Sequence, residues 1–275
     1  MRKKVLIAQE ELQRLYWNER KSSLEIAQLF HCHAMTIRNR IREFGILKRS
    51  PSDARMRYER GDFSGNSVEK AYLLGFRLGD LNAYQTNSRS EMIVIRCHTT
   101  QIAQVTLMRK LFSPYGHVTS SEGRHGYSVN CFVNMTFNFL LPKHEQVPQD
   151  IERSEASIWA FTAGYVDAEG HFGINQGRAR FKIDSYDVHI LEWISNTLER
   201  SSIRIKFRRI ALEGQQQFRL GIFHKDLWRL EVNEANSLQC FIYLVVPYLQ
   251  HEKRKTDMIR CLNNILDRQV KGTVI

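Results

Sequence analysis

Apolar positions near the N-terminus recur every three or four residues, the period of an amphipathic helix. The first of them are Leu12, Leu15 and Tyr16. Ser22 belongs to a residue type that caps helices, and it stands just before a second apolar run. We therefore expect further helices over residues 24–30 and 34–44, the last one ended by Gly45. The pattern predicts a small three-helix domain over residues 1–50.

A polar stretch over residues 51–66 separates this domain from the rest of the chain. It is rich in charged side chains, contains the breakers Pro51 and Gly65, and has no sustained hydrophobic period. We interpret it as a linker.

Two segments of domain size, 67–145 and 154–275, repeat one pattern. Each opens with an apolar helix rich in small residues that ends on an acidic residue, Asp80 in the first copy and Glu169 in the second. Strand-like stretches and further helices follow in both. Because the acidic residues are 89 positions apart, the copies are pseudo-repeats. The predicted fold class is α+β, with two pseudo-symmetric halves behind a helical N-terminal domain.

The charge of the 275-residue chain points to a partner. Its formal net charge is +11, and residues 1–60 hold 14 Lys and Arg against 7 Asp and Glu. Such a surplus favours a polyanion, most commonly nucleic acid. No apolar stretch reaches the roughly 20 residues needed to span a membrane. The five cysteines form no metal-binding or disulfide pattern. We expect a cytoplasmic protein that contacts DNA and no membrane.

Residues 23–30 and 35–41 resemble the helix-turn-helix of the resolvase-like and sigma-like families. The resemblance implies an apolar face on the first helix, formed by Ile26, Ala27, Leu29 and Phe30. On the recognition helix, Ile37 and Ile41 are expected to be buried. Four side chains are then predicted to face bases and phosphates: Thr36, Arg38, Asn39 and Arg40. A plain three-helix bundle with a solvated basic face is the alternative.

Small residues stand four apart in both acidic-ended helices: Gly75 and Gly79, and Gly164 and Ala168. Residues i and i+4 share one helix face, so two such faces permit close approach of the backbones. If the helices pair there, Asp80 and Glu169 meet at the C-terminal ends, where the macrodipole and mutual repulsion disfavour both charges. Mg²⁺, which prefers oxygen ligands, is the expected occupant between them.

Residues 162–170, TAGYVDAEG, resemble the nine-residue signature of the LAGLIDADG homing endonuclease family, and residues 73–81, LLGFRLGDL, match it more loosely. The resemblance covers most of residues 67–275. It implies a monomeric, magnesium-dependent, site-specific endonuclease whose two αββαββα-type repeats form a saddle over double-stranded DNA. It also implies that Asp80 and Glu169 are the catalytic metal ligands, one from each repeat.

Cations alternate with apolar residues in two predicted strands of the second copy. They are Arg178, Arg180, Lys182, Arg204, Lys206 and Arg208. We expect these strands to lie side by side and to form a basic face suited to the major groove of DNA. The matching face of the first copy, with Met92, Val94, Arg96 and His98, is less basic, so its DNA contacts are predicted to be weaker.

Residues 247–255 also resemble the family, which places a basic residue there beside the cut phosphate. Lys253 is the predicted catalytic cation that stabilises the transition-state charge. Arg254 and Lys255 remain alternatives, because the register is open by a residue or two. Lys143 is the corresponding candidate in the first copy.

The first copy departs from the signature. Leu78 stands where the second copy has Asp167, and Arg77 lies inside the motif helix. These departures leave three other functions open: a nickase, a DNA-binding regulator that no longer cuts, and an RNA-binding maturase on the same scaffold.

Overall fold

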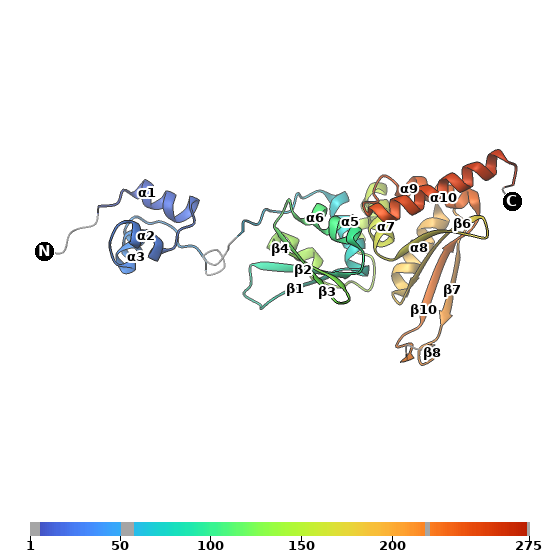
Figure 1. Ribbon diagram of the computed structural model, residues 1–275, viewed down its shortest axis with the longest axis horizontal. Coiled ribbons are helices and arrows are strands. Elements are labelled where there is room, and N and C mark those ends of the chain that lie inside the picture. Colours follow the sequence, from blue (N-terminus) through green and yellow to red (C-terminus); the bar gives the residue numbers. More distant parts are fainter. Residues whose placement is uncertain (1–5, 51–57, 218–220, 274–275) are drawn as a thin grey trace. The chain divides into compact units, whose positions relative to one another are not determined.

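The computed structural model describes residues 6–50, 58–217 and 221–273 (Figure 1). The chain forms two compact units, Met1–Glu59 and Arg60–Ile275. The first unit contains the predicted helical domain, and the second contains both predicted repeats.

The helices of the first unit agree with the sequence pattern. They are α1 (Gln9–Gln13), continued by the π-helical turn η1 (Arg14–Asn18), then α2 (Ser23–Leu29) and α3 (Ala34–Glu43). Ser22 caps α2 through a reciprocal capping box with Glu25. Gly45 follows α3 with φ of 63°, the left-handed conformation that ends many helices.

The core of the first unit follows the predicted apolar face with one exception. Ile26, Ala27, Ile37 and Ile41 are buried. Leu29 was expected among them, but its side chain is 55% exposed. Ile26, Ala27 and the partly buried Phe30 pack into the core of the unit, and Leu29 lies outside the side of the helix that they share.

The second unit contains two halves with the same order of elements. The first half contains α5 (Ser67–Gly79), β1 (Asn82–Gln85), β2 (Met92–Thr99), α6 (Ile102–Phe112), β3 (His117–Gly123), β4 (Gly126–Asn134) and the 3₁₀ helix η2 (Met135–Leu140). After a 3₁₀ turn, η3 (Gln149–Arg153), the second half contains α7 (Glu155–Glu169), β5 (Gly170–Asn175), β6 (Arg178–Ser185), α8 (Val188–Arg200), β7 (Lys206–Ala211), β10 (Leu227–Val232), α9 (Ala235–Val245) and α10 (Glu252–Val270).

Each half builds one antiparallel four-stranded sheet. The strand orders are β1-β2-β4-β3 and β5-β6-β10-β7, so in both the third strand of the half lies at the edge beside the fourth. Two short strands, β8 (Gln216–Gln217) and β9 (Gly221–Ile222), pair in the connection between β7 and β10. The repeated topology confirms the predicted α+β class with two pseudo-symmetric halves.

One face of each sheet is buried against helices. In the first half, the inward residues of β2 and β4, such as Ile95 and Val133, pack on α6. In the second, the inward residues of β6 and β10, such as Ile183 and Leu230, pack against α8 and α9. Helices α5 and α7 pack side by side where the halves meet (Figure 1).

The predicted linker is shorter than its sequence pattern suggested. Residues 51–57 lie outside the described residues, but the stretch from Arg60 onward packs on the first half. The Phe63 ring contacts the Phe137 ring, with centroids 5.3 Å apart, and its backbone N–H donates to the Thr136 hydroxyl. A single half-buried aromatic ring in a polar stretch produces no hydrophobic period, so the sequence pattern did not reveal this contact.

Candidate active site

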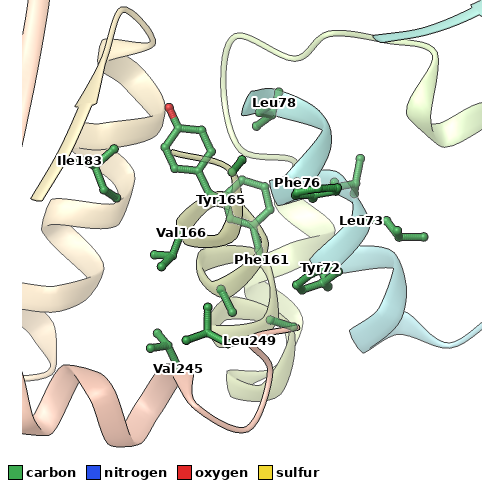
Figure 2. Close-up of a cluster of buried hydrophobic side chains, with 14 of the residues drawn as sticks. Tyr72, Leu73, Phe76, Leu78, Phe161, Tyr165, Val166, Ile183, Val245 and Leu249 are labelled. Atoms are coloured by element: carbon green, nitrogen blue, oxygen red, sulfur yellow. The ribbon is translucent and has the colours of Figure 1, made fainter. Parts of the chain in front are cut away.

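The two motif helices cross with their backbones in contact. A Cβ on Gly75 of α5 would lie 2.0 Å from the carbonyl oxygen of Phe161. A Cβ on Gly164 of α7 would lie 2.1 Å from the carbonyl oxygen of Tyr72. Figure 2 shows the rings of Tyr72 and Phe161 among the buried side chains of this interface. The predicted pairing along the small-residue faces is confirmed, because no larger residue fits either position.

The same close approach continues to the acidic ends of the helices. A Cβ on Gly79 would lie 2.5 Å from the Cβ of Ala168 and 3.0 Å from Oε1 of Glu169. The Glu169 carboxylate therefore lies against the residue that directly precedes Asp80. The two predicted metal ligands, one from each half, meet at the C-terminal ends of α5 and α7.

Both carboxyl groups are held in an environment that disfavours their charge. Burial raises the pKa of Asp80 to about 6, although the charge of Arg254 and a hydrogen bond from Gln104 oppose the shift. Burial and the negative charge of Asp80 raise the pKa of Glu169 to about 7. This is the pairing of repelling carboxylates that the sequence led us to expect.

Gln104 is a site residue that the sequence analysis missed. It lies on α6, is buried, and donates from Nε2 to Oδ2 of Asp80 across 2.8 Å. The contact fixes the orientation of the Asp80 carboxylate. Its sequence signal was a polar residue on the buried face of an apolar helix, which is costly unless the residue has a hydrogen-bond partner.

Asp167, on the second motif helix, accepts hydrogen bonds from two other segments of the second unit. Its Oδ2 accepts hydrogen bonds from the Tyr72 hydroxyl at 2.7 Å and from the backbone N–H groups of Gln250 and His251 at 2.7 and 3.1 Å. Tyr72 belongs to the first half, whereas Gln250 and His251 lead directly into α10. Asp167 thereby ties α5, α7 and the start of α10 together.

Arg254, in the first turn of α10, is a cation whose charge acts on both carboxyl groups. Its charge lowers the pKa of Asp80, Glu169 and Asp167. Its guanidinium donates to the carbonyl oxygen of Ala168 at 3.5 Å. Nε of Arg254 is buried and has no hydrogen-bond partner among the described residues.

The predicted catalytic cation, Lys253, points elsewhere. Its ammonium pairs with Asp257 at 2.8 Å and its side chain is 47% exposed. Lys255 lies 3.7 Å from Glu252 on the same helix. Lys143, exposed in the connection after η2, lowers the pKa of Glu169 through its charge. The geometry therefore favours Arg254, the first of the two alternatives to Lys253.

An open pocket of about 290 Å³ adjoins Glu169 on the sheet side. It is lined by Glu169, His171, Lys182 and Asp184. Burial and the nearby cations lower the pKa of His171, which favours its neutral form. The pocket places a carboxylate, a neutral imidazole and an ammonium beside one another where the motif helix meets β5 and β6.

The basic strands of the second half are not neighbours. Arg178, Arg180 and Lys182 alternate with buried residues on β6, as expected, whereas Lys206 and Arg208 on β7 flank the half-buried Phe207. However, β10 lies between these strands.

The intervening strand adds acidic groups and ion pairs to this face. Glu231 of β10 pairs with Arg208 at 3.3 Å, and Asp184 of β6 accepts two hydrogen bonds from Arg229. Arg204 is exposed but precedes the strand, where its N–H donates to Ser237. Strand order depends on contacts between distant segments, so alternation within one strand did not reveal it.

The predicted DNA-reading residues of the first unit lie on α3. Arg38 and Asn39 are exposed, and Thr36 is half-buried. Arg40 is half-buried and pairs with Glu43 at 2.7 Å. Arg42 is exposed on the same side as Arg38 and Asn39, because residues 38, 39 and 42 share a helix face.

Two features are absent from residues 6–50, 58–217 and 221–273. No group of three or more His, Cys, Asp or Glu side chains in these ranges is arranged as a metal site. No helix in them is long and apolar enough to cross a membrane.

Comparisons with known proteins find similarity to solved structures alone. No family model and no curated protein matches the chain. Among solved structures it is similar to the homing endonuclease I-WcaI bound to its DNA recognition sequence, with TM-score 0.49, 13% identity, and coverage of 70% of this chain and 86% of that chain. A variant of I-SmaMI gives TM-score 0.49, 11% identity, and coverage of 76% and 94%. Mesophilic variants of the homing endonuclease I-DmoI give TM-score 0.45, 17% identity, and coverage of 65% and 89%. All three TM-scores are below 0.5, so the proposal below rests on the geometry of this chain.

Proposed function

We propose that the protein is a site-specific, metal-dependent endonuclease of the homing type that hydrolyses phosphodiester bonds of double-stranded DNA as a monomer. One observation carries this proposal: two equivalent helices, one from each half, bring Asp80 and Glu169 together at their C-terminal ends. A pair of repelling, partly buried carboxylates costs stability, and a cation between them offsets that cost.

The donor set fits a divalent metal. Asp80 and Glu169 would hold the ion, and Mg²⁺ suits them because it is usually bound by one or two carboxylates together with water and substrate phosphates. Such an ion, when bound, supplies a Lewis acid that activates water and stabilises a leaving oxygen. The raised pKa values of both groups support this assignment, because the charge of Arg254 only partly offsets the effect of burial on each carboxyl group.

Three side chains near the carboxyl pair would stabilise charge, orient Asp80 and position α10. Arg254, in place of the predicted Lys253, would be the cation that stabilises charge on the phosphate, because its charge acts on both carboxyl groups. Gln104 would orient Asp80 through its hydrogen bond. Asp167 would act as a positioning residue, since it holds the segment from which Arg254 projects.

The DNA contacts would come from two places. The outward face of the second sheet, with Arg178, Arg180 and Lys206, offers cations to phosphates. The first unit would add base and phosphate contacts through Arg38 and Asn39 of its predicted recognition helix.

Selection of cleaved molecules from a pool of random DNA duplexes tests the proposal. With Mg²⁺ the full chain is expected to enrich duplexes cut at one defined sequence, and with EDTA it is expected to cut none. Glu169→Gln and Asp80→Asn are each expected to lower the cutting rate at least about 100-fold, because metal Lewis acidity is worth several kcal/mol. If both variants cut as fast as the wild type, the nuclease assignment is wrong.

A DNA-binding regulator that does not cut is the second candidate. It is favoured by the exposed basic side chains of α3, Arg38 and Arg42, which suit DNA binding without any catalysis. The same selection separates the two functions. A regulator enriches a bound sequence from the pool, leaves every duplex intact with Mg²⁺, and binds equally well as Glu169→Gln.

A further inference from the structure

The outward faces of the two sheets differ in chemistry. On the first sheet, the face turned away from the core carries Asn82, Tyr84, Met92, Val94, Arg96, His98, His117, Thr119, Ser121, Ser128, Asn130 and Phe132. Within these described strands it contains one arginine and no carboxylate. We call it the first open face.

The corresponding face of the second sheet is densely charged. Its strand residues include Arg178, Arg180, Lys182, Asp184, Lys206, Arg208, Arg229 and Glu231. Six of these are cations and two are anions. We call it the second open face.

Arg96 is the one arginine of the first open face, and its guanidinium is fixed in place. Its Nε donates to Oδ1 of Asn130 at 2.9 Å, and its NH2 group donates to the Tyr84 hydroxyl at 2.8 Å. Both partners are neutral. The side chain is therefore oriented by hydrogen bonds while its positive charge is not cancelled.

Two arginines of the second open face have the opposite arrangement. Arg229 binds the Asp184 carboxylate with two hydrogen bonds, and Arg208 pairs with Glu231. Arg178, at the start of β6, is exposed and has no ion-pair partner within the described part of the chain. Arg180 donates to the carbonyl oxygen of Asn233 at 2.7 Å, so it is also oriented by a neutral partner; the described strands of this face differ from the first open face in holding six cations instead of one arginine.

We propose that the two faces read DNA in different ways: Arg96 recognises a guanine, and the second open face grips phosphates. This inference rests on the proposed DNA-binding function and assigns the specificity within it. A fixed guanidinium matches O6 and N7 of guanine in the major groove, which is the commonest specific contact of arginine. Its preorganisation lowers the entropy lost on binding. A diffuse cationic face attracts phosphates of any sequence.

Two variants with the same chemical change test this division. Arg96→Gln and Arg178→Gln each remove one guanidinium, the first from the first open face and the second from the second. The full chain is used with EDTA, so that DNA is bound and not cut. The measurements are the sequences enriched from a pool of random duplexes and the salt dependence of binding to the enriched wild-type sequence.

The wild type is expected to enrich a motif with a fixed guanine. Arg96→Gln is expected to lose about tenfold or more of the preference for guanine at that position, with a shift towards adenine, because glutamine pairs with the adenine edge. Arg178→Gln is expected to keep the motif, bind all sequences more weakly, and reduce the slope of log K against log salt by about one.

Tyr84→Phe checks that orientation matters as well as charge. It removes one hydroxyl that holds the Arg96 guanidinium and keeps its charge, so guanine preference should fall by a smaller factor than in Arg96→Gln. The melting temperatures of both variants are measured to confirm that they fold.

Two results overturn the inference. If Arg96→Gln folds and enriches the wild-type motif unchanged, Arg96 is not a guanine reader, although the proposed function stands. If the wild type enriches no sequence at all, both the reading role and site-specific DNA binding are wrong.

Discussion

The two motif helices make equivalent contacts at Gly75 and Gly164 but differ one turn further on, at Leu78 and Asp167. Gly75 and Gly164 make matching backbone contacts, to Phe161 and Tyr72 respectively. In the second half the sixth motif residue is Asp167, whose carboxylate bonds to the Tyr72 hydroxyl. The pseudo-symmetric equivalents of Asp167 and Tyr72 are Leu78 of the first half and Phe161 of the second, and both are buried and apolar.

The two copies therefore hold the same position by different interactions. The residue that replaces the acidic position is buried beside apolar neighbours, so Leu78 stabilises the interface that Asp167 supports by hydrogen bonds. Asp167 has an added consequence, because it also fixes the start of α10 and with it Arg254. The first half has only Lys143, exposed in a connecting segment, in the corresponding place.

The largest effect is expected where the halves are equal. Gly75→Ala and Gly164→Ala each place a Cβ about 2 Å from a backbone carbonyl oxygen of the partner helix. Each should lower the free energy of unfolding by about 3 kcal/mol or more, at the upper end of overpacking costs. Urea unfolding measures it. Gly123→Ala is the control, because its nearest neighbour would be 3.8 Å away. Unequal losses at the two glycines would break the equivalence of the helices.

The next largest loss of stability is expected at Leu78, where the two motif helices differ. Leu78→Asp buries a carboxylate that has no backbone donors like those of Gln250 and His251. It should cost about 3 kcal/mol in unfolding free energy. Adding Phe161→Tyr should restore about 1 kcal/mol, because the pseudo-symmetry brings a hydroxyl to the new carboxylate. A single variant as stable as the wild type would mean that Leu78 does not occupy an apolar counterpart of the Asp167 site.

The sequence alone was sufficient for the fold class and for the meeting of Asp80 with Glu169. Small residues four apart on a helix allow the backbones of two helices to approach closely. In both copies the acidic residue directly follows the second of these small residues. It was not sufficient for Gln104, Arg254 or the acidic groups among the strand cations. These depend on contacts between distant segments: α6 against α5, the start of α10 against α7, and β10 between β6 and β7.

The cation assignment predicts a difference between adjacent residues. Arg254→Gln should lower the cutting rate by about 100-fold, the cost of removing one charge-stabilising donor. Lys253→Gln should change the rate less than about threefold, because the exposed pair with Asp257 is weak. Single-turnover cutting of the enriched duplex is the measurement. The reverse ranking would restore Lys253 as the catalytic cation.

A smaller change in the free energy of unfolding is expected when pH is varied in the absence of metal. The folded pKa values of Asp80 and Glu169 are raised to about 6 and about 7, so the native state binds extra protons between pH 4 and 7. The stability they contribute is fully present below pH 4 and is lost as pH rises through 6 and 7. Relative to the double variant Asp80→Asn, Glu169→Gln, the free energy of unfolding of the wild type should fall by on the order of 2 kcal/mol between pH 5 and 8. Parallel pH profiles in urea unfolding would argue against the repulsion.

The most direct test of the shared site is the stabilisation by Mg²⁺ at pH 8, measured by unfolding of the wild type and of Asp80→Asn and Glu169→Gln separately. The account predicts that Mg²⁺ stabilises the wild type, by about 2.7 kcal/mol at a hundred times its Kd, and that either single substitution removes most of this gain. A gain retained in full by either variant, or a wild type that Mg²⁺ does not stabilise, would contradict the claim that the two halves build one metal site.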